Sequence, residues 1–145
     1  MQNAAVPSTS RKKRAARNGV FISHATQDTW IARHIASDVE KIGNRKRKRV
    51  ATYLDAKDIR AGEVFTESIR RNIEECSKFL VLLSSASVAR PWVIFESGAA
   101  VQLRKTIIPI LDKLEPSEIP SPLARYQAVD LNDLEKHLAQ IVETK

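Results

Sequence analysis

One carboxylate stands in an otherwise uncharged stretch of the chain and is the first candidate for chemistry. Every residue from Trp92 to Val101 is apolar or small except Glu96 and the serine after it. Glu96 follows Trp92 by four residues, so the two side chains share a face if the segment is helical. Burying an unpaired charge costs several kcal/mol, so such an acid needs a partner, a wet cleft or a catalytic role. Residue type alone leaves open a structural role, paired with Arg90 or Arg104.

The elements that must position Glu96 alternate between strands and helices. Apolar runs predict strands at residues 19–23, 50–54, 78–83, 106–111 and 126–129. Apolar spacing predicts helices at residues 27–42, after Gly62, at about 91–103, and after Asp130, a natural N-cap. The helix after Gly62 is expected to bury Phe65, Ile69, Ile73 and Cys76. This alternation without hairpin turns predicts an α/β fold: a flavodoxin-like three-layer sandwich with a central parallel sheet of about five strands.

Topology indicates where a ligand should bind. In open parallel sheets, ligands bind beyond the carboxyl ends of the strands, at the point where the strand order reverses. For the common order 2-1-3-4-5, that point lies between the first and third strands. The loops that follow Ser23 and Leu83 are therefore expected to line the cleft.

Several site classes are excluded by what the chain lacks. Its four glycines, at positions 19, 43, 62 and 98, form no GxGxxG motif and no P-loop. A phosphoryl-accepting receiver domain needs acids after the first and third strands, where this chain has Ser23-His24 and Ser84-Ser85. One cysteine and three scattered histidines predict neither a disulfide nor a metal site.

The net charge of +7 is local. Five cations lie in a tail without acids and five more form one run, Arg45, Lys46, Arg47, Lys48 and Arg49, which leaves −3 elsewhere. We expect residues 1–17 to be a disordered basic tail and residues 18–145 to form one domain. The run lacks interleaved aromatics, so a solvated loop is its ordinary interpretation, and nucleic acid is expected as a partner only through the run or the tail. No stretch predicts a membrane span or a signal peptide, which favours a cytoplasmic protein.

Three segments in register carry a resemblance to a known family. They are VFISHATQD at residues 20–28, DAKDIRAG at 55–62 and LLSSASVARPWVIFE at 82–96. In order and separation they resemble the first conserved box, the BB loop and the serine-then-Trp-xxx-Glu segment of Toll/interleukin-1 receptor (TIR) domains. The resemblance covers about residues 18–145, including YQAVDL at 126–131, and the bacterial branch fits best.

For catalytic members, the resemblance implies cleavage of the nicotinamide–ribose bond of NAD+, which is a substrate, with no separate cofactor and no metal. The products are nicotinamide and ADP-ribose, or a cyclic ADP-ribose. The essential carboxylate falls on Glu96, while the residues expected near the dinucleotide are Phe21, Ser23, His24, Ser84, Ser85 and Trp92. Each of these six also has an ordinary structural interpretation, as core, turn or cap.

The BB loop is the second functional element that the resemblance implies. Asp58, Ile59, Arg60 and Gly62 fall in it and are expected to mediate self-association with other TIR domains, triggered by a partner protein. The plant-type Trp-Cys pair is Trp92-Val93 here, and no separate oligomerisation domain is evident. Two alternatives stay open: a non-catalytic interaction module in which Glu96 is structural, and a nucleoside or nucleotide N-glycosidase.

Overall fold

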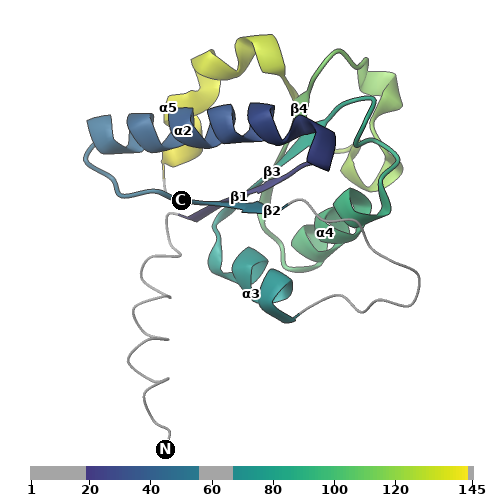
Figure 1. The fold of residues 1–145 in the computed structure, drawn as a ribbon, viewed down its shortest axis with the longest axis horizontal. Coiled ribbons are helices and arrows are strands. Elements are labelled where there is room, and N and C mark those ends of the chain that lie inside the picture. The colour runs from purple at the N-terminus through teal and green to yellow at the C-terminus, as the bar shows by residue number, and fades with distance from the viewer. Residues whose placement is uncertain (1–18, 56–66, 144–145) are drawn as a thin grey trace, which may run out of the picture.

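The computed structural model describes residues 19–55 and 67–143 and shows a five-stranded parallel sheet with helices on both faces (Figure 1). Its strands are β1 (Gly19–Ser23), β2 (Ala51–Asp55), β3 (Lys78–Leu83), β4 (Thr106–Leu111) and β5 (Val129–Asp130), in the order β2-β1-β3-β4-β5. The α-helices are α2 (Thr29–Arg45), α3 (Glu67–Glu75), α4 (Pro91–Gln102) and α5 (Leu138–Val142). Short 3-10 helices are η1 (Thr26–Asp28), η2 (Pro116–Glu118), η3 (Ser121–Leu123) and η4 (Leu131–His137). The predicted three-layer sandwich and its strand order are confirmed.

The central strands divide the core between the two faces of the sheet. All six residues of β3 are buried, because helices cover both of its faces. Successive side chains of a strand point to opposite faces. Accordingly, Leu80 and Leu82 pack with α2 and α5, whereas Phe79, Val81 and Leu83 pack with α3 and α4. This is why β3 reads as a continuous apolar run rather than an alternating one.

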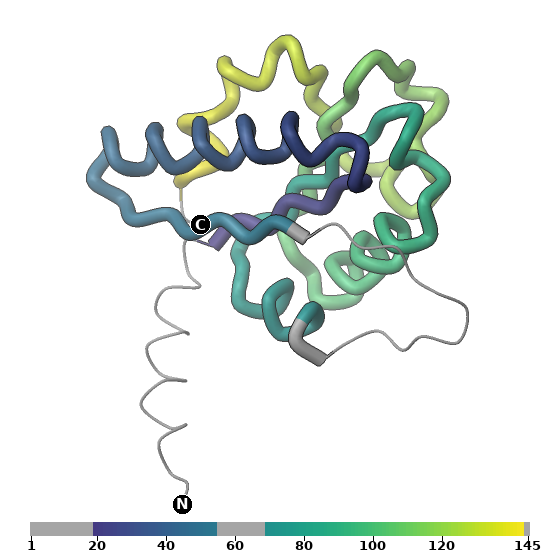
Figure 2. The backbone as a smooth tube through the Cα atoms, viewed as in Figure 1, coloured from purple at the N-terminus to yellow at the C-terminus, as the bar shows by residue number. Residues whose placement is uncertain are grey.

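Helix α2 returns along the sheet from the end of β1 and packs beside α5 (Figure 2). Its buried face carries Ile35, Ala36 and Val39, at the spacing of one helical stripe. The helix was predicted at residues 27–42. The structure begins it at Thr29, after the η1 turn, and extends it to Arg45.

The last strand differs from the prediction of residues 126–129. The Tyr126 amide donates to the Leu123 carbonyl at 3.1 Å, so this part of the backbone closes a turn and does not pair in the sheet. Pairing starts at Val129, opposite Ile110. Asp130 does cap the next helical segment, through a 2.9 Å bond from the Asn132 amide, but that segment is the 3-10 helix η4 before α5.

Some predictions lie outside the described residues. They are the basic tail at 1–17, the buried position of Phe65, and the BB-loop residues Asp58, Ile59, Arg60 and Gly62. Within residues 19–55 and 67–143, no helix is both long and apolar enough to cross a membrane. The same residues contain no group of three or more His, Cys, Asp or Glu side chains that could hold a metal ion.

Candidate active site

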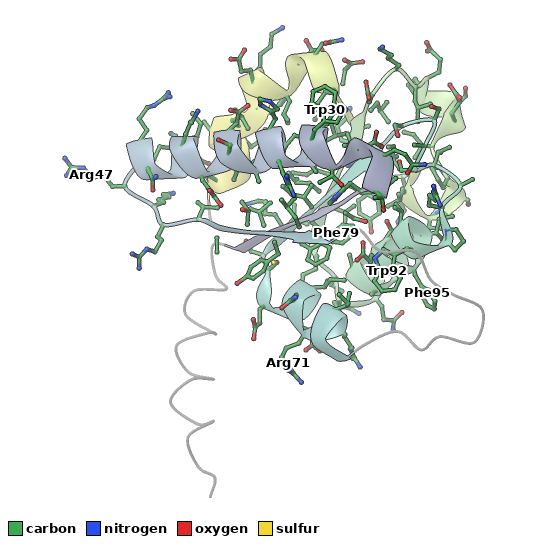
Figure 3. The ribbon with its side chains drawn as sticks, viewed as in Figure 1. Trp30, Arg47, Arg71, Phe79, Trp92 and Phe95 are labelled. Atoms are coloured by element: carbon green, nitrogen blue, oxygen red, sulfur yellow. The ribbon has the colours of Figure 1, made fainter. Side chains whose placement is uncertain are left out.

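Glu96 is fully buried on the inner face of α4. Pro91 at the first helical position fixes the start of the helix, where its missing N–H costs nothing. From there, Trp92, Val93 and Glu96 face the interior, while Ile94 and Phe95 face outwards and are 42% and 50% exposed. Figure 3 shows Trp92 and Phe95 together at one end of the molecule. The helix therefore carries a carboxylate among apolar side chains on its buried side.

The partner of this carboxylate comes from the end of β1. The Ser23 hydroxyl donates a 2.6 Å hydrogen bond to Glu96 Oε1. Both residues have zero exposed surface. Because both groups are buried and the bond is short, Ser23 holds the carboxyl group of Glu96 in one orientation. The bond places Glu96 beside the carboxyl end of β1, where the strand order reverses.

His24 follows Ser23 and is also buried, at 1% exposure. Its Nδ1 lies 3.1 Å from the Ile22 carbonyl oxygen. Since a carbonyl only accepts, Nδ1 carries a proton and donates it to this oxygen. The ring is thus oriented by the backbone of β1, one residue after Ser23 in the chain.

A second polar network joins the loops after β1 and β3. The Ser84 hydroxyl donates to Asp28 Oδ2 at 2.5 Å and accepts from the amides of Ala86 and Ser87, at 3.1 and 3.3 Å. The Ser87 hydroxyl donates to the Leu82 carbonyl at 2.7 Å and accepts from the Ser84 amide at 2.9 Å. Ser84 and Ser87 are therefore occupied in shaping the loop, whereas Ser85 beside them is exposed.

The predicted aromatic residues lie in the core. Phe21 is fully buried and its ring stacks on Phe79, with centroids 5.4 Å apart and planes 7° from parallel. Trp92 is 3% exposed and belongs to the same cluster, between the sheet and α3 and α4. In this conformation both rings are part of the hydrophobic core. A ligand could contact them only if neighbouring residues moved.

The structure thus brings Ser23 and Glu96 together, buries His24 directly after Ser23 in the chain, and sets Ser84 in the second polar network. Sequence reasoning did not single out Asp28, whose carboxylate is 8% exposed. Its signal was its place at the end of the VFISHATQD segment, in the loop after the first strand that topology predicted to lie near a ligand. No sequence pattern pairs it with Ser84, 56 residues away.

Comparisons with known proteins agree on one family. The family model described as TIR domain matches residues 20–142. A probable 2′ cyclic ADP-D-ribose synthase of Brachypodium distachyon is 28% identical over 134 residues, covering 90% of this chain and 57% of that protein. The chain therefore spans little more than half the length of this relative.

Solved structures show the same fold. The TIR domain of the Toll-related receptor TRR-2 from Hydra magnipapillata superposes with a TM-score of 0.59 at 23% identity, covering 83% of this chain and 91% of that one. The TIR domains of the activated Roq1 resistosome, which recognises the pathogen effector XopQ, give a TM-score of 0.60 at 15% identity, covering 85% and 96%. With the family model matched over most of its length, the chain belongs to the TIR domain family.

Proposed function

We propose that this TIR domain cleaves the nicotinamide–ribose bond of NAD+ and that Glu96 is its catalytic carboxylate. The observation that carries the proposal is the 2.6 Å bond from Ser23 to Glu96, which fixes a carboxylate at the switch point of the sheet. The similarity to a probable 2′ cyclic ADP-D-ribose synthase supports activity of this class.

The chemistry needs little beyond a positioned carboxylate. Nicotinamide is a cationic leaving group, so the C–N bond breaks with its electron pair moving to the ring nitrogen, and no general acid is required. The ribose becomes oxocarbenium-like in the transition state, and an ionised carboxylate near its hydroxyls stabilises that charge. Attack by water then gives ADP-ribose and a proton, whereas attack by a nucleophile within the ADP-ribose gives a cyclic product.

Burial of Glu96 bears on how activity is controlled. With no exposed surface on Glu96 or Ser23, NAD+ reaches the carboxylate only after the residues around it move. Self-association of the domain, triggered by a partner protein, is the event we propose for this rearrangement. A role in bacterial defence or signalling belongs to the same proposal.

Turnover at high protein density tests the catalytic assignment. Purified protein, concentrated and crowded so that it can assemble, is incubated with NAD+, and released nicotinamide is quantified. Glu96→Gln keeps the shape of the side chain and should abolish release. Glu135→Gln, on an exposed residue of η4, is the matched control and should retain it. Equal release by wild type and Glu96→Gln would contradict the assignment.

A non-catalytic interaction module is the second candidate, favoured by the complete burial of Glu96. In that case Glu96→Gln lowers thermal stability, no NAD+ turns over in the assembled state, and partner binding depends on Ile59 or Arg60 rather than Glu96. A nucleoside or nucleotide N-glycosidase is the remaining alternative. It would cleave substrates without nicotinamide in preference to NAD+, so assays with nucleosides and other nucleotides distinguish it from the two candidates above.

A further inference from the structure

Five consecutive cations, Arg45 to Arg49, form a turn at the end of α2, which we call the basic turn. Four of them are exposed, and Lys48 is partly exposed. Within the described residues, none of the five side chains forms an ion pair. Glu40, the nearest acid in sequence, instead accepts a hydrogen bond from Thr52. The turn therefore concentrates positive charge that the neighbouring residues do not neutralise.

The backbone of the basic turn is held in one shape. The Arg47 amide donates to the Asn44 carbonyl at 3.0 Å, and the Lys48 amide donates to the Gly43 carbonyl at 2.8 Å. These two bonds form a Schellman C-cap, with Arg47 in the left-handed position at φ 60°. Val50, directly after the turn, is buried and anchors it to the core. The cations therefore project from a fixed backbone.

The basic turn lies away from the candidate active site. Figure 3 shows Arg47 at one end of the molecule and Trp92 and Phe95 at the other. A ligand on the turn would therefore bind at the opposite end of the molecule from Trp92 and Phe95 of helix α4.

We propose that the basic turn binds the phosphodiester backbone of nucleic acids without sequence preference. Arginine binds phosphate oxygens through two parallel N–H groups, and three of the five residues are arginines. The turn contains no aromatic side chain on which a base could stack. Binding is therefore expected to depend on contacts with the phosphates of the nucleic acid. Electrostatic membrane anchoring takes a second, apolar signal. In the part of the chain that the structure describes, the large exposed hydrophobic side chains are Trp30, Leu54, Ile94 and Phe95, and all of them lie outside the turn.

Salt dependence measures the number of phosphates contacted. Binding of labelled 20-base-pair DNA duplexes of two unrelated sequences is followed by fluorescence polarisation between roughly 50 and 200 mM salt, with an RNA duplex and single strands as further arms. In the full chain, Arg45→Gln/Arg47→Gln/Arg49→Gln should make the slope of log K against log salt shallower by about two to three, at about 0.9 per phosphate. The control Arg33→Gln/Lys113→Gln/Arg125→Gln removes the same charge and should leave the slope unchanged.

Arg47→Gly separates binding from folding. Glycine suits the left-handed conformation, so the variant should unfold at the same or a higher temperature while the salt slope falls by about 0.9. Equal slopes for the basic-turn and control variants would overturn the proposal. So would binding to phosphatidylserine vesicles that duplex DNA does not compete away, or a strong preference for one of the two sequences.

Discussion

The hydroxyl of Ser23 lies 2.6 Å from Glu96 Oε1, although 73 residues separate them in the chain. Ser23 is the last residue of strand β1, and Glu96 lies on helix α4. The bond therefore connects the carboxyl end of the sheet to the helical layer that contains α4. A carboxyl group without exposed surface is costly to bury, and the bond from Ser23 offsets part of that cost.

Ser23→Ala should therefore lower both stability and activity. Removing one partner of a buried hydrogen bond typically costs about 1–3 kcal/mol. Urea unfolding measures the change in free energy, and nicotinamide release from concentrated protein measures turnover. Ser77→Ala is the control, because the Ser77 hydroxyl makes only a 3.3 Å contact to the neutral Gly19 carbonyl. Equal losses of stability in the two variants would show that the bond to Glu96 is unimportant.

The Asp28–Ser84 bond should be energetically coupled. Asp28→Ala, Ser84→Ala and the double variant form a cycle, and urea unfolding of all four proteins gives the coupling energy. Neighbours in one buried network couple by about 0.5–3 kcal/mol, so we expect a value in that range. Ser84→Ala should be the more damaging single change, since the Ser84 hydroxyl also accepts from two backbone amides. Additive single effects would contradict a direct interaction.

Much of the fold could be predicted because the sheet is covered on both faces. Strands β1, β3 and β4 lie where the apolar runs predicted them, since every residue of β1 and β3 is buried and the pattern there is unbroken. The last strand could not be placed in the same way. It contains only two residues, and the chain before it is shaped by a turn at Tyr126 rather than by apolar patterning.

The candidate site was predictable in its location but not in its contacts. The Trp-xxx-Glu spacing put Trp92 and Glu96 on one face of a helix, and the structure places both in the interior. Nothing in the sequence says that Ser23 binds Glu96 or that Ser84 binds Asp28. These pairs meet only through the crossover connections of a parallel sheet, so their geometry depends on the packing of the whole domain.

The thiol of Cys76 should be unreactive in the folded protein. Burial raises the pKa of Cys76 from its ordinary value of 9.0 to about 12, while the charge of Lys105 opposes this change and that of Glu75 adds to it. Because the thiolate is the nucleophile, Ellman's reagent at pH 8 should react slowly with native protein and rapidly after unfolding in urea.

The same shift has a consequence for stability at high pH. Between pH 9 and about 12 the unfolded chain releases the thiol proton while the folded protein keeps it, so stability falls as pH rises through this range. Urea unfolding at several pH values should show a smaller fall in Cys76→Ala than in wild type. Rapid labelling of native protein at pH 8 would contradict the assignment of a buried, protonated thiol.

Two helical glycines should respond to alanine with opposite signs. At Gly98, on α4, an added Cβ would meet no other described part of the protein within 4 Å beyond its own stretch of helix, so Gly98→Ala should stabilise the protein by up to about 1 kcal/mol through helix propensity. At Gly43, near the end of α2, the Cβ would lie 2.6 Å from Val50 Cγ2 and 2.9 Å from the Lys48 carbonyl oxygen. The carbonyl belongs to the backbone of the basic turn and cannot easily move, so Gly43→Ala should destabilise by about 1–3 kcal/mol, as overpacking does. Thermal and urea unfolding of both variants measure the difference. Equal stability of Gly43→Ala and Gly98→Ala would contradict the close packing of α2 against the basic turn.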